Sequence, residues 1–424
     1  MSNPHVLIVG AGLGGLTLAQ VLRKQGVSFE IFERDPSEAS RTQGWSLAIH
    51  TVLDDLLASV PDDMPPFRES VSAMHPIKVE DQLAIYIGGQ RFGRNNSPET
   101  PFVRANRQRL RTWLATNIDV QYGKFATKVE QSDDKVTVFF QDGSSASGDV
   151  LIGADGTNSL VREHVLGKSN KDVLQYMPIS SITAESIVLT GEAFERQLEV
   201  AHSFGFVNID SDSIIVQGLV KSLPGTADEQ QQQQPGGEFH WILLWRDPIT
   251  QHSGRSLVDT LPAEQRLSIA HSMTQSLPEP LKHILHHTRP EHIRPTGWVV
   301  RDAVIDALPV SRATLLGDAA HPTSPFRGEG AVNAMRDAFL LGAALAGLKK
   351  DSAGADKERV HEALAGYQAE MVPRGVKVVT DAKAQLGFYR REWEKVRILG
   401  LPLQKLPWEK VEAGPEGVKV TQLD

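Results

Sequence analysis

The chain has 424 residues, of which 40% are hydrophobic and 23% are charged, as is ordinary for a globular protein. This length predicts two domains, because one core seldom grows so large. The net charge of −8 disfavours nucleic acid or an anionic membrane as main partner, and the absence of cysteine excludes disulfides, thiolate zinc sites, iron–sulfur clusters and dithiol redox chemistry. Without a signal peptide or an apolar run of about 20 residues, we expect a cytoplasmic protein with no transmembrane segment.

The first 33 residues predict a strand–turn–helix–strand unit that binds a dinucleotide. Residues 5–9 and 28–32 are short apolar runs, and residues 13–24 have helical spacing. Between them lies Gly10-Ala11-Gly12-Leu13-Gly14-Gly15, a GxGxxG motif in which the glycines permit a tight turn, close approach to a pyrophosphate and close helix packing. Glu33 ends the second strand, where a carboxylate can accept both ribose hydroxyls of an adenosine. The alternative is a chance glycine-rich turn beside a surface carboxylate.

The pattern of apolar and polar residues changes in the middle of the chain. Residues 106–118 predict a helix, and residues 135–140 and 149–153 predict strands. The strand at 149–153 leads into the motif GADGTNSLVRE. In this motif Asp155 can approach a polar ligand, and Arg162 can hold the Asp155 carboxylate or a phosphate. From residue 176 to 299, alternating runs at 203–209, 213–220 and 238–246 favour an antiparallel sheet. The polar, glutamine-rich residues 224–237 are interpreted as a hairpin connection.

Two features of this second region leave alternatives open. Alternation in residues 239–246 puts Phe239, Trp241, Leu243 and Trp245 on one face and His240, Ile242, Leu244 and Arg246 on the other, and either face could wall a pocket. His283, His286 and His287 are interpreted as exposed helix residues. We predict no metal site, because a helix would align only His283 and His287 and a metal needs a third ligand.

A third motif follows near the end of the chain. Residues 313–317 predict a buried strand, after which Asp318 lies at the carboxyl end, where open α/β sheets bind ligands. Residues 325–330 form a tight loop before a helix at about 330–349. The backbone N–H groups that begin this helix would favour a negatively charged ligand. From residue 371 onward we expect a further helix, followed by irregular chain at Pro402 and Pro407.

The three motifs, in this order and at these separations, resemble those of the class A flavoprotein monooxygenases of the para-hydroxybenzoate hydroxylase and salicylate hydroxylase-like family. The resemblance implies an α/β fold: a Rossmann-like FAD-binding domain, a mixed-sheet substrate domain and C-terminal helices. The corresponding domain limits are residues 1–70, 98–175 and 300–370 for FAD, residues 71–97 and 176–299 for the substrate, and residues 371–424 for a C-terminal helical segment.

The resemblance also implies roles for individual residues. Asp155 would bridge the FAD and nicotinamide sites, Asp318 would hold the flavin ribitol, and Pro325 would lie at the flavin edge where oxygen adds. Trp45 and Gly330 are likewise predicted near the flavin. Two departures put side-chain contacts in doubt: the loop reads Gly328-Glu329-Gly330 where the family commonly has Gly-Gln-Gly, and Val332 replaces a polar residue. The predicted cofactor-binding residues are Gly10, Gly12, Leu13, Gly14, Gly15, Glu33, Arg34, Arg41, Gly44, Arg107, Asp155, Asp318, Pro325, Gly328, Gly330, Ala331 and Val332.

The implied reaction is hydroxylation or epoxidation of a small aromatic, polyketide or alkaloid-type molecule. NADPH or NADH would reduce the FAD transiently, since only one GxGxxG is present, and molecular oxygen would then form a flavin C4a-hydroperoxide. No protein nucleophile or metal is required, and the sequence identifies no general base. A reductase or a halogenase of the same fold is the first alternative, and a non-catalytic prenyl-binding chaperone the second. The substrate, the choice of NADPH or NADH, and the oligomeric state, monomer or dimer, stay open.

Overall fold

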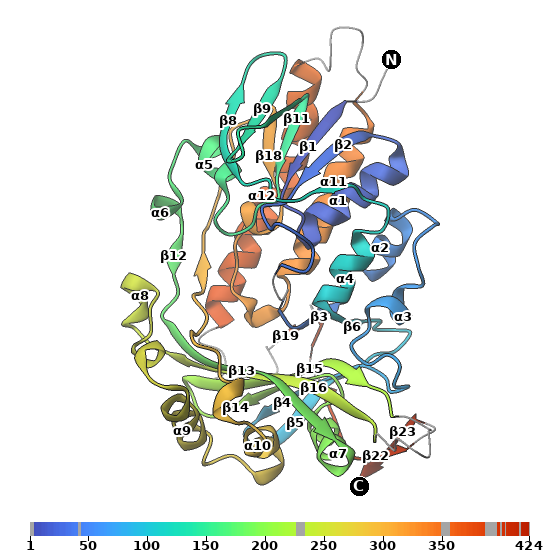
Figure 1. Ribbon diagram of the computed structural model, residues 1–424, viewed down its shortest axis with the longest axis vertical. Helices are drawn as coiled ribbons and strands as arrows, with labels where there is room; N and C mark the ends of the chain where they lie inside the picture. Colours follow the sequence, from blue (N-terminus) through green and yellow to red (C-terminus); the bar gives the residue numbers. More distant parts are fainter. Residues whose placement is uncertain are drawn as a thin grey trace.

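The computed structural model contains two large sheets, one in each half of the molecule (Figure 1). Among the described residues, no helix combines the length and apolar composition that crossing a bilayer requires. The structure describes residues 4–40, 44–225, 234–348, 357–385, 397–398, 401–402, 404–414 and 417–423.

The first sheet is parallel and has five strands. In sheet order the strands are β18 (Ala313–Leu315), β11 (Val150–Gly153), β1 (His5–Val9), β2 (Ser28–Phe32) and β7 (Val120–Gln121). The sequence patterns predicted the first four of these strands, and the structure confirms them. Strand β18 ends before Gly317, because that residue adopts a left-handed conformation with φ +59° and begins a turn. Since all strands point the same way, their carboxyl ends meet at one edge.

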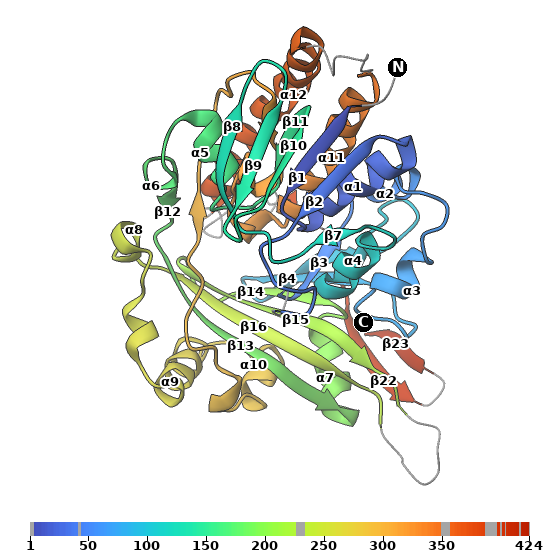
Figure 2. The same cartoon turned by 45° about the horizontal axis from the view of Figure 1, so that its top comes forward.

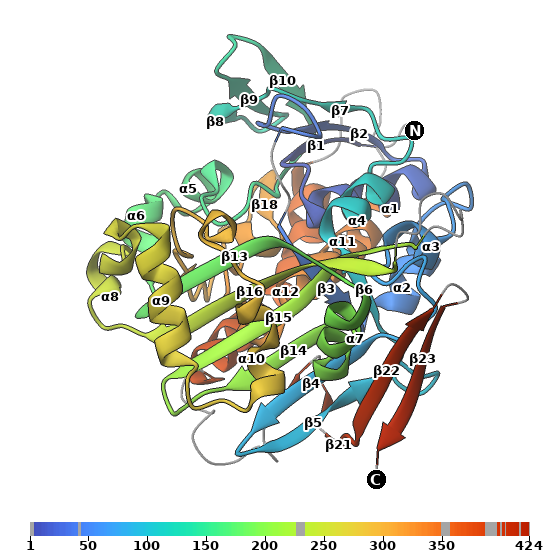
Figure 3. The same cartoon turned by 60° about the horizontal axis from the view of Figure 1, so that its bottom comes forward.

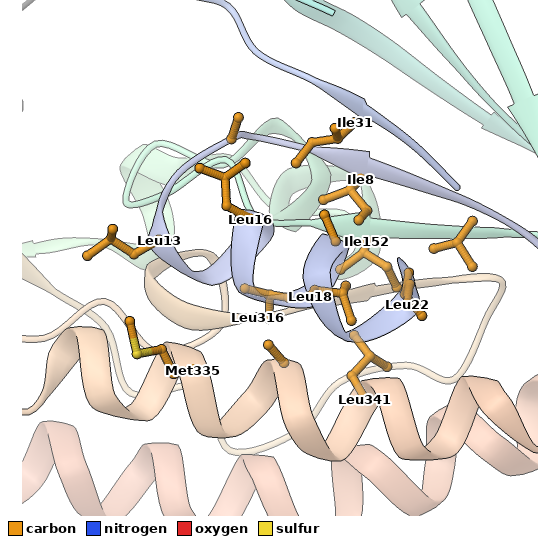
Figure 4. Packing of buried hydrophobic residues seen from close by; sticks show 14 of the residues in the cluster. Ile8, Leu13, Leu16, Leu18, Leu22, Ile31, Ile152, Leu316, Met335 and Leu341 are labelled. Carbon is orange, nitrogen blue, oxygen red and sulfur yellow. The ribbon is translucent and has the colours of Figure 1, made fainter. Parts of the chain in front are cut away.

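Helices α1 (Leu13–Gln25), α11 (Gly330–Ala346) and α12 (Lys357–Gln385) pack on this sheet in successive layers. Figure 4 shows Leu16, Leu18 and Leu22 of α1 between strand residues and Met335 and Leu341 of α11. α1 and α11 pack closely at Gly342, where a Cβ would overlap Val21. This packing fixes the start of α1 relative to the start of α11.

Smaller elements surround this sheet and connect it to the second one. The predicted helix at 106–118 is confirmed in shorter form, as α4, which is capped by Asn106 and ends at Leu114. The elements are β3 (Ser46–Ile49), α2 (Leu53–Ser59), α3 (Phe67–Val71), β6 (Val103–Asn106), α4 (Arg107–Leu114), β8 (Ala126–Gln131), β9 (Val136–Phe140), β10 (Ser145–Gly148), α5 (Leu160–Leu166), α6 (Asn170–Val173), β12 (Gln175–Tyr176) and β17 (Arg301–Asp302).

The second sheet has seven strands and is mostly antiparallel. It contains the three predicted strands, and β15 and β16 form the expected hairpin; residues 226–233 of its connection lie outside the described part. In sheet order the strands are β13 (Ile179–Thr190), β16 (Gly236–Arg246), β15 (Ser213–Leu223), β14 (Phe204–Asn208), β4 (Gln82–Ile87), β5 (Gln90–Asn95) and β21 (Gln404–Lys405).

Helices cover only one face of this sheet, and they decide which side of β16 is core. Phe239, Trp241 and Leu243 pack in the cluster beneath these helices, whereas Ile242 and Leu244 belong to a separate cluster on the opposite face. That opposite face points toward the first half of the molecule. The covering helices, seen in front of the sheet in Figure 3, are α7 (Gly191–Val200), α9 (Ala263–Met273) and α10 (Glu279–His286); α8 (Thr250–Ser253) lies nearby.

The C-terminal tail differs from the expectation. The predicted further helix is present as α12, but it begins at Lys357, and short strands follow where irregular chain was expected, so residues 371–424 are not one helical segment. β21 joins the second sheet beside β5 (Figure 3). β22 packs against α7 (Figure 2). The expected break at Pro402 and Pro407 does not occur, because the backbone pairing of the neighbouring short strands is kept. The other domain limits stay predictions. The remaining strands are β19 (Arg397–Ile398), β20 (Leu401–Pro402), β22 (Trp408–Gly414) and β23 (Gly417–Leu423).

Candidate active site

A cavity of about 450 Å³ is lined by residues of both halves of the molecule. One part of its wall comes from the starts of α1, α4 and α11, and the other part from the uncovered face of the seven-stranded sheet. The predicted site residues that line it are Gly12, Leu13, Gly14, Gly44, Trp45, Arg107, Asp318, Pro325, Gly328, Gly330 and Ala331.

The glycine turn before α1 has the predicted geometry. Gly10 has φ +109°, and a Cβ there would overlap the carbonyl oxygen of Ala154; a Cβ on Gly15 would overlap the carbonyl of Gly10. Gly12 differs, since a Cβ there would meet no atom within 4 Å. The first turn of α1 carries no acidic residue. Its free N–H groups therefore present positive partial charge beside open space, as a phosphate site requires.

Glu33 lies directly beside this turn. Its Oε2 accepts a hydrogen bond of 3.0 Å from the N–H of Ala11, and its Oε1 accepts one of 3.0 Å from the N–H of Asp35. The buried Arg111 was missed by the sequence reasoning: its Nη2 lies 3.9 Å from Glu33 Oε2, and its Nε donates to the carbonyl of Ala11. The sequence signal that could have revealed Arg111 is an arginine in a predicted helix that faces a predicted acidic residue. These contacts hold the carboxylate at the edge of the turn.

Asp155 lies beside the cavity, between two residues that line it, Ala154 and Gly156. Its Oδ2 accepts the N–H of Leu160 at 2.7 Å, whereas Oδ1 is buried without a hydrogen-bond partner among the described residues. Burial raises the pKa of the Asp155 carboxyl group. A buried oxygen of this kind has unused capacity for a polar ligand.

Arg162 binds backbone oxygens and makes no close ion pair with Asp155 among the described residues. Its guanidinium is buried and donates to the carbonyl oxygens of Asp318 and Ala319 at 3.2 and 3.0 Å, and also to Thr157 O and Asn170 Oδ1. Arg162 therefore ties the two loops together through backbone carbonyls, and the Asp155 carboxylate acts on it through its charge alone; the expected phosphate contact stays a prediction. These contacts depend on how the two loops pack together, which the sequence pattern does not reveal.

Asp318, Gly44 and Arg107 come together at the cavity as predicted. Burial raises the pKa of the Asp318 carboxyl group, and the nearby charges of His321 and Arg107 oppose that increase. Arg107 is the first residue of α4, and its backbone N–H donates to the carbonyl of Trp45 at 3.2 Å. Gly44 adopts φ +85°, and a Cβ at this position would lie 3.9 Å from the Arg107 side chain. A carboxylate and a guanidinium thus face the same space.

A buried ion-pair network supports the Asp318 loop from behind. Asp337 Oδ2 accepts the N–H of Gly317 and bonds to His321 Nε2, both at 2.7 Å, and its Oδ1 accepts from Arg374 Nη2 at 2.7 Å. Burial alone would lower the pKa of His321, but the Asp337 carboxylate outweighs it and raises the pKa. Burial likewise opposes the Asp337 anion, but His321 and Arg374 lower its pKa overall. The network fixes α12, α11 and the loop together.

The loop before α11 lines the cavity with Pro325, Gly328, Gly330 and Ala331. The first backbone bond of the helix runs from Asn333 N–H to Glu329, and the first turn contains no acid, so the preceding N–H groups are available to an anion.

Besides Gly10, Gly15, Glu33 and Asp155, two described residues among the predicted contacts, Val332 and Arg34, do not line the cavity. The side chain of Val332 is buried in the core, which leaves only its backbone for a ligand, and Arg34 is exposed outside the cavity. Arg41 lies outside the described residues.

An apolar, aromatic wall completes the cavity on the sheet side. Phe204, Phe206, Val216, Ile242 and Leu244 line it, which settles the open question about the faces of β16. Trp45 covers part of this wall: its ring stacks on His240 at a centroid distance of 4.0 Å and on Trp298 at 4.8 Å, and its Nε1 donates to Glu185 at 2.7 Å. Trp45 thus lines the cavity, as the predicted flavin-proximal position requires.

Comparison with known proteins identifies the family. Residues 268–382 match a family model described as an FAD binding domain, and residues 8–46 match an NAD(P)-binding Rossmann-like domain. The chain is 39% identical, over 96% of its length and 98% of the relative, to the FAD-dependent monooxygenase thnD of Trichoderma harzianum. The chain therefore belongs to the FAD-dependent monooxygenases. It is also 28% identical to the FAD-dependent monooxygenase phnB of Penicillium herquei, over 94% of each chain.

Solved structures of this family share the fold. Klebsiella pneumoniae HpxO complexed with FAD and uric acid superposes with a TM-score of 0.68 at 20% identity, covering 91% of this chain and 88% of HpxO. The 2,6-dihydroxypyridine-3-hydroxylase of Arthrobacter nicotinovorans has a TM-score of 0.65 at 19% identity, covering 92% and 94%. The predicted para-hydroxybenzoate hydroxylase-type fold is confirmed, and the enzyme uses FAD with NAD(P)H as reducing co-substrate.

The residues at the site fit FAD. The open space at Gly12 beside the acid-free start of α1 suits the diphosphate, and Glu33 lies where an adenosine ribose would follow. The unpartnered Oδ1 of Asp155 and the cavity-lining Asp318 supply further polar contacts at the carboxyl edge of the sheet.

Proposed function

We propose that this monooxygenase inserts one atom of molecular oxygen into a small aromatic or polyketide-type molecule that binds against the seven-stranded sheet. One observation carries the proposal: a single cavity joins the starts of α1 and α11, whose first turns carry no acidic residue, to an apolar and aromatic wall. The first part suits a negatively charged dinucleotide, and the second suits an apolar ring.

The cofactor contacts follow from this arrangement. Gly12, Leu13 and Gly14 would bind the FAD diphosphate through backbone N–H groups, with Glu33 on the adenosine ribose. Asp318 and Arg107 would bind the chain between the diphosphate and the ring, and Gly44 would allow close approach. The further contacts that we propose are Gly10, Gly15, Asp155, Pro325, Gly328, Gly330 and Ala331, with Val332 acting through its backbone N–H alone.

The chain's own residues position the reactants and exclude water. The bound FAD would supply the redox chemistry, which is hydride acceptance from NAD(P)H and activation of oxygen. The free N–H groups at the start of α11 would stabilise negative charge on a reduced ring system. Trp45, Trp298 and the sheet residues would orient the substrate and keep the site dry. No side chain needs to act as a nucleophile.

The test uses the purified enzyme reconstituted with FAD. Candidate phenols and polyketides would be screened for stimulation of NAD(P)H oxidation, and products made under ¹⁸O₂ would be analysed by mass spectrometry. We expect a bound flavin spectrum and a product that carries one ¹⁸O atom. A protein that stays colourless after FAD addition, or a product without the label, would contradict the proposal; a reduced product would indicate a reductase.

A further inference from the structure

The sheet side of the cavity contains one buried charge that the proposed reaction does not use. Arg104 belongs to β6, pairs in register with Ala48 of β3, and lines the cavity although only 6% of the residue is exposed. Its neighbours in the cavity wall are residues of the sheet, Gln82, Leu83 and Phe204. It lies three residues before Arg107, which begins α4 on the cofactor side.

The guanidinium of Arg104 is held in one orientation. Its Nε donates to Ser46 Oγ at 2.9 Å, and Ser46 in turn donates to the carbonyl of Leu219. Its central carbon lies 3.8 Å from the centroid of the Phe204 ring. Nη1 and Nη2 donate to no described residue, and neither is among the buried unpartnered atoms. The two outer nitrogens are therefore fixed and open to the cavity, as in a preorganised binding fork.

The charge of Arg104 has no close counterion. Within the described part of the chain, no carboxylate lies within 4 Å of its guanidinium, and Asp81 acts on it only from farther away. Burial lowers the pKa of Arg104 to about 9 and raises that of Asp81 to about 6. His240, behind Trp45, is neutral because burial and then the Arg104 charge lower its pKa. A buried cation without a partner favours an anionic ligand.

The surroundings restrict the shape of that ligand. Phe204 lies against the guanidinium, and Phe102, Trp45 and Trp298 line the same cavity. Aromatic walls favour a planar ring, and the fork geometry favours two oxygens or one strongly anionic oxygen. We propose that Arg104 selects the substrate, binding an acidic oxygen, a carboxylate or an ionised phenol, that is conjugated to a planar ring. This inference rests on the proposed function and names the substrate class of the same site.

The test compares two probes that have the same shape and differ in charge, 2-naphthoate and 2-naphthamide. Their dissociation constants for the FAD-loaded enzyme would be measured from changes in the flavin spectrum. The wild-type enzyme should bind the acid at least about tenfold more tightly, because only the acid forms a charge-assisted pair. In Arg104→Met the ratio should fall to about one. Arg104→Lys should give an intermediate ratio, since it keeps the charge but loses the fork.

The control variant is Arg196→Met. Arg196 is an exposed arginine of α7 that pairs with Glu192 and does not line the cavity, so the ratio of the two dissociation constants should not change. FAD affinity and thermal unfolding of each variant would show that the fold is intact. Where Arg104→Met does not fold, Arg104→Lys and the wild-type ratio decide.

Two results would overturn the inference: a wild-type ratio below about three, or a preference for the acid that survives in Arg104→Met. These outcomes differ from failure of the proposed function, which would appear as absent flavin binding or absent ¹⁸O in the product. An enzyme that oxygenates neutral rings and ignores the charge of the probe would keep the function and lose only the role of Arg104.

Discussion

The two sides of the cavity are built in different ways. The cofactor side consists mainly of glycines, helix starts and backbone N–H groups, whereas the sheet side consists of large side chains such as Trp45, Phe204 and Arg104. Backbone groups recognise what all members of a cofactor family share, and side chains can vary with the substrate. Substitutions on the cofactor side should therefore abolish FAD binding, whereas substitutions on the sheet side should change substrate selectivity.

The largest expected effect separates two glycines of one turn. Gly10→Ala should cost about 3 kcal/mol or more of folding free energy, because its Cβ overlaps the Ala154 carbonyl at a positive φ. Gly12→Ala should leave stability within about 0.5 kcal/mol, since its Cβ meets open space, but should weaken FAD binding at least about tenfold. Chemical denaturation and flavin titration measure the two effects. Equal loss of stability in both variants would contradict this assignment.

The next effect concerns the network behind the Asp318 loop. Asp337→Asn should cost about 2–3 kcal/mol, because the buried His321 loses its anionic partner, whereas Arg374 keeps its pair with Glu370. The His321 pKa is raised, so its contribution is complete below pH 6.5 and is lost as the pH rises through the raised value. The Asp337 pKa is lowered, so its contribution is present above pH 3.8 and is lost as the pH falls.

The penalty of Asp337→Asn should therefore be largest between about pH 4 and pH 6.5 and smaller in alkaline solution. Denaturation at several pH values measures it. The control is Glu192→Gln, which breaks an exposed pair with Arg196 and should leave the unfolding midpoint unchanged. A penalty that does not vary with pH would show that His321 contributes nothing.

A smaller effect is expected from Asp318→Ala. Removing a carboxylate that faces the cavity should raise the dissociation constant of FAD about tenfold, in line with the loss of one or two hydrogen bonds to a charged group. Ultrafiltration followed by flavin absorbance measures retention. Full flavin occupancy and full turnover in the variant would remove Asp318 from the site.

The smallest effect should come from Trp45→Phe on the sheet side. An aromatic ring is retained, but a phenyl replaces the larger indole and the hydrogen bond from Nε1 to Glu185 is lost. We expect the KM for the organic substrate to rise about two- to fivefold, with FAD affinity unchanged. Steady-state kinetics and flavin titration on the same preparation would test this. A larger effect on FAD than on KM would place Trp45 on the cofactor side instead.

The same contrast explains how much the sequence could predict. The β1–α1–β2 unit, Glu33 and the Asp318 loop were predictable, because glycine turns and strand ends have short, local signatures. Arg34 and Val332 were assigned from position within a motif, and their side chains point elsewhere. The face of β16 that meets the cavity depends on where distant helices pack, which alternation cannot reveal. Arg104 did have a local signal, a lone charge in the apolar run Phe102–Ala105.

A hydrogen bond links the described part of the C-terminal tail to a residue of the cavity wall. Gln82 lines the cavity, and its carboxamide is bound by Arg91 and by the buried Glu409 of β22, whose pKa is lowered to about 2 despite its burial because His202 and Gln82 donate to it. Deleting β22, or fusing a protein where it docks, would remove one of the hydrogen bonds that hold this amide and leave those to Arg91 and Asn95. A change at the chain end is therefore expected to act on the cavity wall through Gln82, without a substitution in the wall itself.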